Sequence, residues 1–113
     1  MKVDRKEEPG GITILRFNGA FDAANLDKVS TGINGLIAKG CKRLVLNLKE
    51  LEFINSSALG YIIKTMEGLR DEGGGLVISQ PSHQFETVIT ELGIDQMFDI
   101  SSDDDKAIQQ LRD

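Results

Sequence analysis

The sequence predicts an α/β domain in which a mixed, mostly parallel sheet of four or five strands carries about four helices. Two observations predict this class. Short β-branched or apolar runs alternate along the chain with longer segments whose apolar residues recur at the spacing of one helix face. Glycine and proline clusters separate these segments. Strands that alternate with helices usually pair in parallel, and two adjacent strands at the start add one antiparallel pair.

Length and composition limit the possibilities. The chain has 113 residues, which suits a single domain over residues 1–113 with one core. A net charge of −5 disfavours binding to nucleic acids. No long uncharged apolar stretch is present, so we expect no membrane span. The charged N-terminus does not resemble a signal peptide, and Cys41 as the single cysteine fits a reducing compartment, so we expect a cytoplasmic protein.

The first forty residues predict a β-hairpin followed by a helix. Residues 2–8 are charged and alternating, as in a weak edge strand with Val3 facing inward, and a turn at 9–11 joins them to a β-branched strand over 11–19. A helix over 22–38 follows, and Asp22 is placed to cap its first N–H groups. The inner face of this helix consists of Leu26, Val29, Ile33, Leu36 and Ile37.

The middle of the chain predicts a buried strand, a short loop and a second helix. Residues 43–49 form a nearly continuous apolar run, as in a central strand that is covered on both faces. After the loop, a helix begins near Ser56–Ser57 and ends before the glycines at 73–75. Its inner face consists of Leu59, Ile62, Ile63, Met66 and Leu69.

The last third predicts two more strands and two more helices. Residues 76–79 form a central strand, Pro81-Ser82 opens a third helix that ends at Gly93, and residues 97–100 form a short strand. Three acids at 103–105 suit the positive end of a final helix. The inner faces of these two helices consist of Phe85, Val88, Ile89 and Leu92, and of Ile108 and Leu111. At this length we expect uneven coverage of the two faces of the sheet.

Catalytic and metal sites find no support in the residues. His83 is the only histidine, and we expect it on the surface. Neither serine of the pair at 56–57 lies in a G-x-S-x-G elbow. One histidine and one cysteine leave no zinc site. The glycines at 73–75 lead from a helix into a strand, which is the wrong direction for a phosphate loop. We therefore expect no catalytic residue, no metal and no cofactor.

The segment FINSSALG, residues 53–60, is the strongest candidate for a functional site. An apolar run that looks buried leads into Asn55, Ser56 and Ser57. All three residue types cap helices, but a single cap residue is enough. The segment also follows a strand of a parallel sheet, at the edge where ligands and partners usually dock. Capping and a functional role both remain open on these grounds.

The same segment resembles the signature of the STAS domain family, named for sulfate transporters and anti-sigma factor antagonists. That signature reads roughly apolar-aromatic, apolar, Asp, Ser, Ser or Thr, Gly, Leu, Gly; here Asn55 and Ala58 replace its Asp and first Gly. The stretch NGAFDAANLDKV resembles the family segment that leads into the first helix, with Gly19, Phe21 and Asp22 in the matching positions. LVLNLKEL resembles the preceding strand and loop, where the family often has an Asp in place of Asn47.

The resemblance implies a stand-alone bacterial anti-sigma factor antagonist, a non-enzymatic regulator of transcription. It implies that Ser57 is phosphorylated by a partner that is both serine kinase and anti-sigma factor, that phosphorylation ends binding, and that a phosphatase restores it. The partner surface would comprise Asp22, Asn55, Ser56, Ser57 and Ala58. The missing Asp would weaken the kinase reaction, and the Ala58 methyl would stand where a partner needs close approach.

Two other functions remain open. The first is a non-phosphorylated STAS adaptor, such as a subunit of a lipid-transport or sensory complex. The second is a small hydrolase that uses Ser57, although the sequence offers no base for it.

Overall fold

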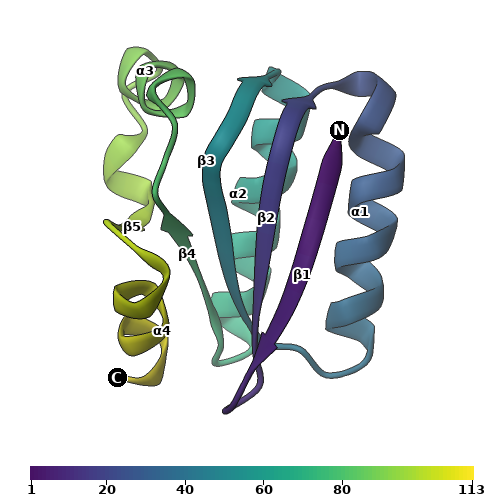
Figure 1. Ribbon diagram of the computed structural model, residues 1–113, viewed down its shortest axis with the longest axis vertical. Coiled ribbons are helices and arrows are strands. Elements are labelled where there is room, and N and C mark those ends of the chain that lie inside the picture. Colours follow the sequence, from purple (N-terminus) through teal and green to yellow (C-terminus); the bar gives the residue numbers. More distant parts are fainter.

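The computed structural model describes residues 1–113, which form one mixed sheet with the strand order β1-β2-β3-β4-β5 (Figure 1). The strands are β1 (Lys2–Glu8), β2 (Ile12–Phe21), β3 (Arg43–Ile54), β4 (Gly75–Ser79) and β5 (Asp99–Ser101). β1 pairs antiparallel with β2, and the remaining neighbours all pair in parallel. The predicted mixed, mostly parallel sheet is therefore confirmed.

Four α-helices and one short 3-10 helix cover this sheet unevenly. They are α1 (Ala23–Ala38), α2 (Ser56–Asp71), α3 (His83–Glu91), η1 (Asp95–Met97) and α4 (Asp104–Arg112). Side chains from α1, α2 and α3 join one face of the sheet in a cluster of 20 buried residues. The other face is covered by α4 alone, with a cluster of 6 buried residues. The expected unequal coverage is present, and none of the helices is long and apolar enough to cross a membrane.

The prediction that the strand ends at residue 49 and a loop follows is wrong, because β3 continues to Ile54. Its pairing with β2 contains two irregularities, the first opposite Arg16–Asn18 and the second opposite Gly19–Ala20. Each such bulge inserts an extra residue and turns the following side chains relative to the sheet. Ile54 is consequently buried, whereas Phe53 is 47% exposed. The apolar run before the serines is thus only partly buried.

Two details of the C-terminal third also differ from expectation. Leu92 does not belong to the inner face of α3, because the helix ends at Glu91 and Leu92 is exposed at its C-cap. Gly93 then reverses the chain with a φ of +70°, and Ile94 packs against the main core instead. The expected strand at 97–100 is partly the helix η1, so that β5 begins only at Asp99.

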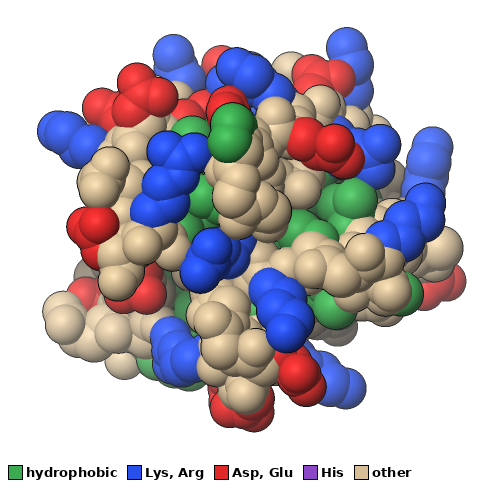
Figure 2. Space-filling view, turned by 90° about the horizontal axis from the view of Figure 1, so that it is seen from below, with side chains coloured by type: hydrophobic (Ala, Val, Ile, Leu, Met, Phe, Trp, Pro, Cys, Tyr) green, Lys and Arg blue, Asp and Glu red, His purple; other side chains and the backbone are tan.

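The two ends of the sheet differ in what they present. The carboxyl ends of β2 and β3 lie at the top of Figure 1, where α1 and α2 begin. Figure 2 shows the opposite end, where Lys and Arg side chains lie among acidic ones around hollows floored by apolar side chains. The predicted site residues belong to the upper end.

Candidate functional site

The carboxyl ends of β2 and β3 bring the two predicted site segments together. These strands run in parallel, and Phe21 pairs with Ile54 at their ends. The N–H of Asn55 also donates to the carbonyl of Phe21 at 3.1 Å. Asp22 and Asn55 therefore start their two helices side by side, as expected for residues that follow neighbouring parallel strands.

Asp22 caps α1, as the sequence predicts. Its Oδ1 accepts hydrogen bonds from the N–H of Ala24 at 3.0 Å and from the Asn25 side-chain amide at 3.2 Å. The same Asn25 amide donates to the carbonyl of Ala20 at 2.7 Å, which fixes its orientation. The second carboxylate oxygen of Asp22 accepts no hydrogen bond from the chain. A half-buried carboxylate with one free oxygen remains available to a binding partner.

Asn55 alone provides the side-chain cap of α2. Its Oδ1 accepts a hydrogen bond from the N–H of Ala58 at 2.8 Å. Ser56 and Ser57 occupy the first two positions of the helix, are exposed, and form no hydrogen bond through their hydroxyls. The interpretation of these serines as caps is therefore wrong. Capping does not explain why two hydroxyls stand here.

The start of α2 also carries free hydrogen-bond donors. The first N–H groups of any α-helix lack partners within the helix, and Asn55 satisfies only that of Ala58. The N–H groups of Ser56 and Ser57 have no acceptor within the chain. With the positive end of the helix dipole, these donors favour an anion. The two serines thus combine accessible hydroxyls with surroundings that stabilise negative charge.

Ala58 differs from the other predicted site residues, because its side chain is fully buried, with 0% exposure, within the main core. Leu59 and Ile62 on the same helix are buried in this cluster too. A partner docked on the folded domain cannot touch the Ala58 methyl. The expectations that Ala58 lines the partner surface and that its methyl obstructs a partner are therefore wrong.

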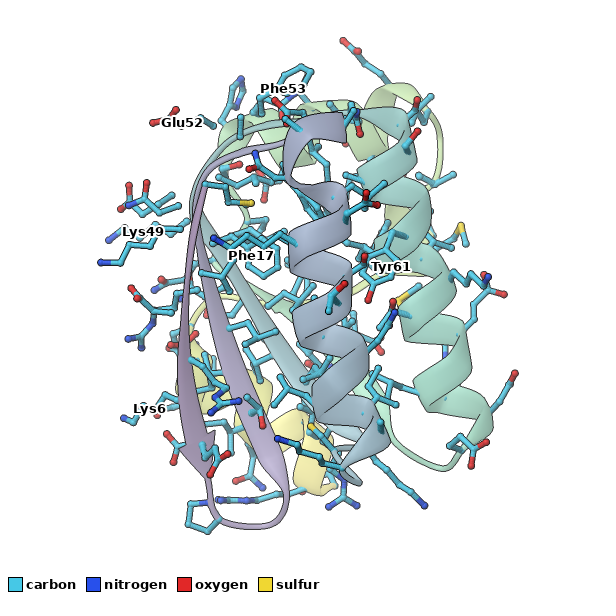
Figure 3. All side chains as sticks on the ribbon, turned by 90° about the vertical axis from the view of Figure 1, so that its right-hand side faces the viewer. Lys6, Phe17, Lys49, Glu52, Phe53 and Tyr61 are labelled. Carbon is cyan, nitrogen blue, oxygen red and sulfur yellow. The ribbon has the colours of Figure 1, made fainter.

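Phe53 is the surface residue at this end that sequence reasoning missed. Its ring projects at the top of the molecule, where α1 and α2 begin (Figure 3). Exposed aromatic side chains are enriched in protein interfaces. The sequence carries a signal for this exposure, because the buried residues Leu48, Leu51 and Ile54 recur every third position and so break the alternation of a regular strand.

The lone histidine and the lone cysteine both contact the hydroxyl group of a threonine. His83 is exposed, as predicted, and the contact of its ring is with Thr87 on its own helix at 3.4 Å. No group of three or more His, Cys, Asp or Glu side chains is arranged to hold a metal ion. Cys41 is half-buried, and its thiol contacts the hydroxyl of Thr13 at 3.5 Å.

A second polar cluster lies on the α4 side of the sheet and joins α4 to the central strands. Asp104 Oδ1 accepts hydrogen bonds from Asn47 Nδ2 at 2.9 Å and from Ser79 Oγ at 2.7 Å. Asp104 Oδ2 accepts one from Arg16 at 2.8 Å, and Asn47 Nδ2 also donates to Gln80 at 3.1 Å. The sequence predicts for Asp104 only a favourable interaction with the helix dipole. The structure shows that it links α4 to β2, β3 and β4.

The surroundings of Asp104 set its charge state. Burial raises the pKa of the carboxyl, but hydrogen bonds from Arg16, Ser79 and Asn47, together with the Arg16 charge, outweigh burial and hold the pKa below its usual range. Asp104 is therefore ionised at neutral pH. Asn47 serves it as an uncharged donor, a role that an Asp at this position would not fill.

Comparison with known proteins places these features in a family. A family model described as the STAS domain matches residues 5–107. The chain is 26% identical over 106 residues to the anti-sigma F factor antagonist of Paenibacillus polymyxa, which covers 93% of this chain and 91% of the relative. The crystal structure of an anti-sigma factor antagonist from Mycobacterium paratuberculosis superposes with a TM-score of 0.85 at 22% identity, covering 99% of this chain and 94% of that one.

The fold also matches two structures of one further protein. The anti-sigma factor antagonist SpoIIAA in its unphosphorylated form gives a TM-score of 0.82 at 20% identity, over 98% of this chain and 96% of that one. The Bacillus cell fate determinant SpoIIAA in the phosphorylated form gives a TM-score of 0.76 at 20% identity, over 98% of this chain and 100% of that one. Because the family model spans nearly the whole fold described above, the chain belongs to the STAS domain family.

Proposed function

We propose that this protein is an anti-sigma factor antagonist, a cytoplasmic regulator without enzymatic activity that binds an anti-sigma factor which is also a serine kinase. The observation that carries the proposal is the exposed Ser57 hydroxyl, free of hydrogen bonds, at the start of α2. The sequence relative from Paenibacillus polymyxa, named an anti-sigma F factor antagonist, supports it over nearly the full length. Binding of the partner would release its sigma factor for transcription.

The proposed partner surface is the end of the molecule formed by Asp22, Asn55, Ser56, Ser57 and Phe53. Phe53 offers an apolar anchor of the kind that dominates binding energy at interfaces. Asp22 offers a free carboxylate oxygen, and the serines offer hydroxyls and open N–H groups. An aromatic anchor surrounded by polar groups is the usual anatomy of a protein interface.

Phosphorylation of Ser57 would switch this surface off. A phosphoserine adds a charge of about −1.5 to −2 and three acceptor oxygens. The open N–H groups and the dipole of α2 favour that charge in the free domain, so the fold tolerates it. Within an interface the same charge must be desolvated and would repel acidic groups of the partner. A phosphatase would then restore binding without any change of fold.

Asn55 supports a second candidate, the non-phosphorylated adaptor. The amide of Asn55 caps α2 but lacks the carboxylate that the family signature has at this position. If the kinase uses that carboxylate to orient the serine, this chain would bind its partner without being phosphorylated. The adaptor would then use the same surface in a lipid-transport or sensory complex.

The test is a phosphorylation and binding assay with a purified candidate anti-sigma kinase from the same genome. Wild-type protein, Ser57→Ala and Ser56→Ala are incubated with kinase and ATP, and any phosphate is mapped by mass spectrometry. We expect phosphate on Ser57 in the wild type and in Ser56→Ala, and none in Ser57→Ala. Ser56→Ala is a matched control, because it removes a neighbouring exposed hydroxyl that forms no hydrogen bond.

Binding of the same variants completes the test. Ser57→Ala should bind the kinase constitutively, and Ser57→Asp should bind weakly. Asn55→Asp keeps the cap and should speed phosphorylation if the missing carboxylate limits the reaction. Binding that is indifferent to Ser57→Asp, together with no phosphate, would refute the switch and favour the adaptor.

A further inference from the structure

We propose that the hollow between β1 and α1 binds a small amphipathic anion, an acidic head group on an apolar chain such as a fatty carboxylate. The hollow has a volume of about 470 Å³. This volume lies within the range of roughly 300–1,000 Å³ that is typical of small-molecule sites. None of its lining residues belongs to α2, and its ligand does not depend on the function proposed above.

The position of the hollow follows from the edge of the sheet. β1 is the edge strand, and α1 packs against β2 and α2 more than over β1. Val3 and Arg5 pair with Phe17 and Leu15, so their side chains lie on the same face of the sheet as α1. Lys6, one residue on, points away from α1 (Figure 3). The inner face of β1 is therefore left partly uncovered.

The floor of the hollow is apolar. Leu15 from β2 and Val29 and Ile33 from α1 are buried members of the main core. Val3 from β1 and Leu36 from α1 are only partly buried against them. Binding to such a floor is stabilised by about 25 cal/mol for each Å² of apolar ligand surface that is removed from water. An apolar chain is accordingly the part of a ligand that fits here.

The rim of the hollow is basic. Its charged lining residues are Lys2, Arg5 and Lys28, with no acid among them, although the chain as a whole has a net charge of −5. Arg5 and Lys28 form no ion pair, and Lys2 has only an exposed one with Asp4 at 3.9 Å. An arginine can hold a carboxylate through two parallel hydrogen bonds. This charge complementarity selects an anionic head group.

Gly32 has no side chain and therefore leaves space open on the α1 side of the hollow. It lies in the middle of α1, where a glycine costs about 1 kcal/mol relative to alanine. A Cβ at Gly32 would meet no atom within 4 Å, so the space beside it is open. A large side chain at this position would fill the hollow while improving the helix propensity. Gly60, an exposed glycine of α2 that also has open space, offers a matched control.

The experiment titrates decanoate, below its micellar concentration, into ¹⁵N-labelled protein and follows amide chemical shifts. We expect saturable shifts confined to β1, the adjoining part of β2 and α1. Decyltrimethylammonium, which has the same chain and the opposite charge, should produce none at equal concentration. Equal shifts with the cation, or no saturable shifts with decanoate, would overturn the proposal.

Variants locate the ligand. Arg5→Gln should weaken decanoate binding about tenfold or more, the effect of losing one hydrogen bond to a charged group. Lys6→Gln removes the same charge from the opposite face of β1 and should change the affinity less than about twofold, because exposed charges act weakly at a distance. Gly32→Leu should abolish binding, and Gly60→Leu should retain it. Undiminished affinity in Arg5→Gln or Gly32→Leu would exclude this hollow as the site.

Discussion

Replacing Asn47 with Asp tests whether the polar cluster around Asp104 holds α4 onto the sheet. Asn47 is 7% exposed and donates to Asp104 Oδ1 at 2.9 Å. The substitution removes this donor and puts a second carboxylate beside the first. Two unit charges about 4 Å apart repel by about 4 kcal/mol at an effective dielectric constant of about 20. Arg16, which pairs with Asn47 in the sheet, offsets part of this repulsion. We expect the free energy of unfolding to fall by about 2–4 kcal/mol at pH 7.

The assay is urea unfolding followed by circular dichroism at a series of pH values. Because the folded-state pKa of Asp104 lies below its unfolded value of about 3.9, its stabilisation is fully present at neutral pH and is lost as the pH falls below about 4. In Asn47→Asp, two neighbouring carboxyls share a proton more readily, so the repulsion is relieved on acidification. The stability difference between variant and wild type should therefore shrink toward acidic pH.

A charge swap provides the control. The double variant Asn47→Asp with Asp104→Asn again places one carboxylate beside one amide, and it keeps Arg16 next to the carboxylate. It should recover most of the stability that Asn47→Asp loses. The effects of the two substitutions would then not be additive, and the difference measures a favourable coupling energy between the two positions. A loss below about 0.5 kcal/mol in Asn47→Asp, or strictly additive effects in the double variant, would refute the reasoning.

Two further pairs of variants test local features by urea unfolding. Asn55→Ala should cost about 1 kcal/mol, because it removes the side-chain cap of α2. Ser56→Ala should change stability by less than about 0.5 kcal/mol, and equal losses would contradict the assignment of the cap. Gly74→Ala should destabilise the fold by several kcal/mol, about 3 or more, because its Cβ would overlap the backbone carbonyl of Lys42. Gly68→Ala, within α2 and next to open space, should instead stabilise by up to about 1 kcal/mol, and a loss there would contradict the helix argument.

The periodicity of apolar residues along the chain was enough to locate most helices and strands and the polar residues that follow two of the strands. Asp22 and Asn55 could be placed at neighbouring helix starts, because each follows a strand and parallel strands end at the same edge. The choice between Asn55 and the serines as the cap could not be made, since all three residue types accept the same hydrogen bond. Only side-chain geometry distinguishes them.

The directions of individual side chains near the site could not be predicted from the sequence either. Phe53 and Ala58 exchange their expected roles, the aromatic ring being exposed and the small residue buried. The exposure of the Phe53 ring depends on the bulges in β3. These bulges arise from the pairing of β3 with β2 and not from local propensity. Ala58 lies in the first turn of α2, and which side of that turn faces the core depends on how the helix docks on the sheet.

By itself, the sequence determined the alternation of strands and helices, the mixed sheet and the edge at which the candidate site lies. These features follow from spacings of two and 3.6 residues and from helix and turn signals, all of which act over a few neighbouring positions. Only the tertiary structure decided the cluster around Asp104 and the hollow beside α1. Asp104 bonds to Arg16, 88 positions away, and to Asn47, 57 positions away. The hollow is likewise lined by residues of β1 and of the middle of α1, which are far apart in the sequence. Such contacts depend on how complete elements pack in space, and no local spacing encodes them.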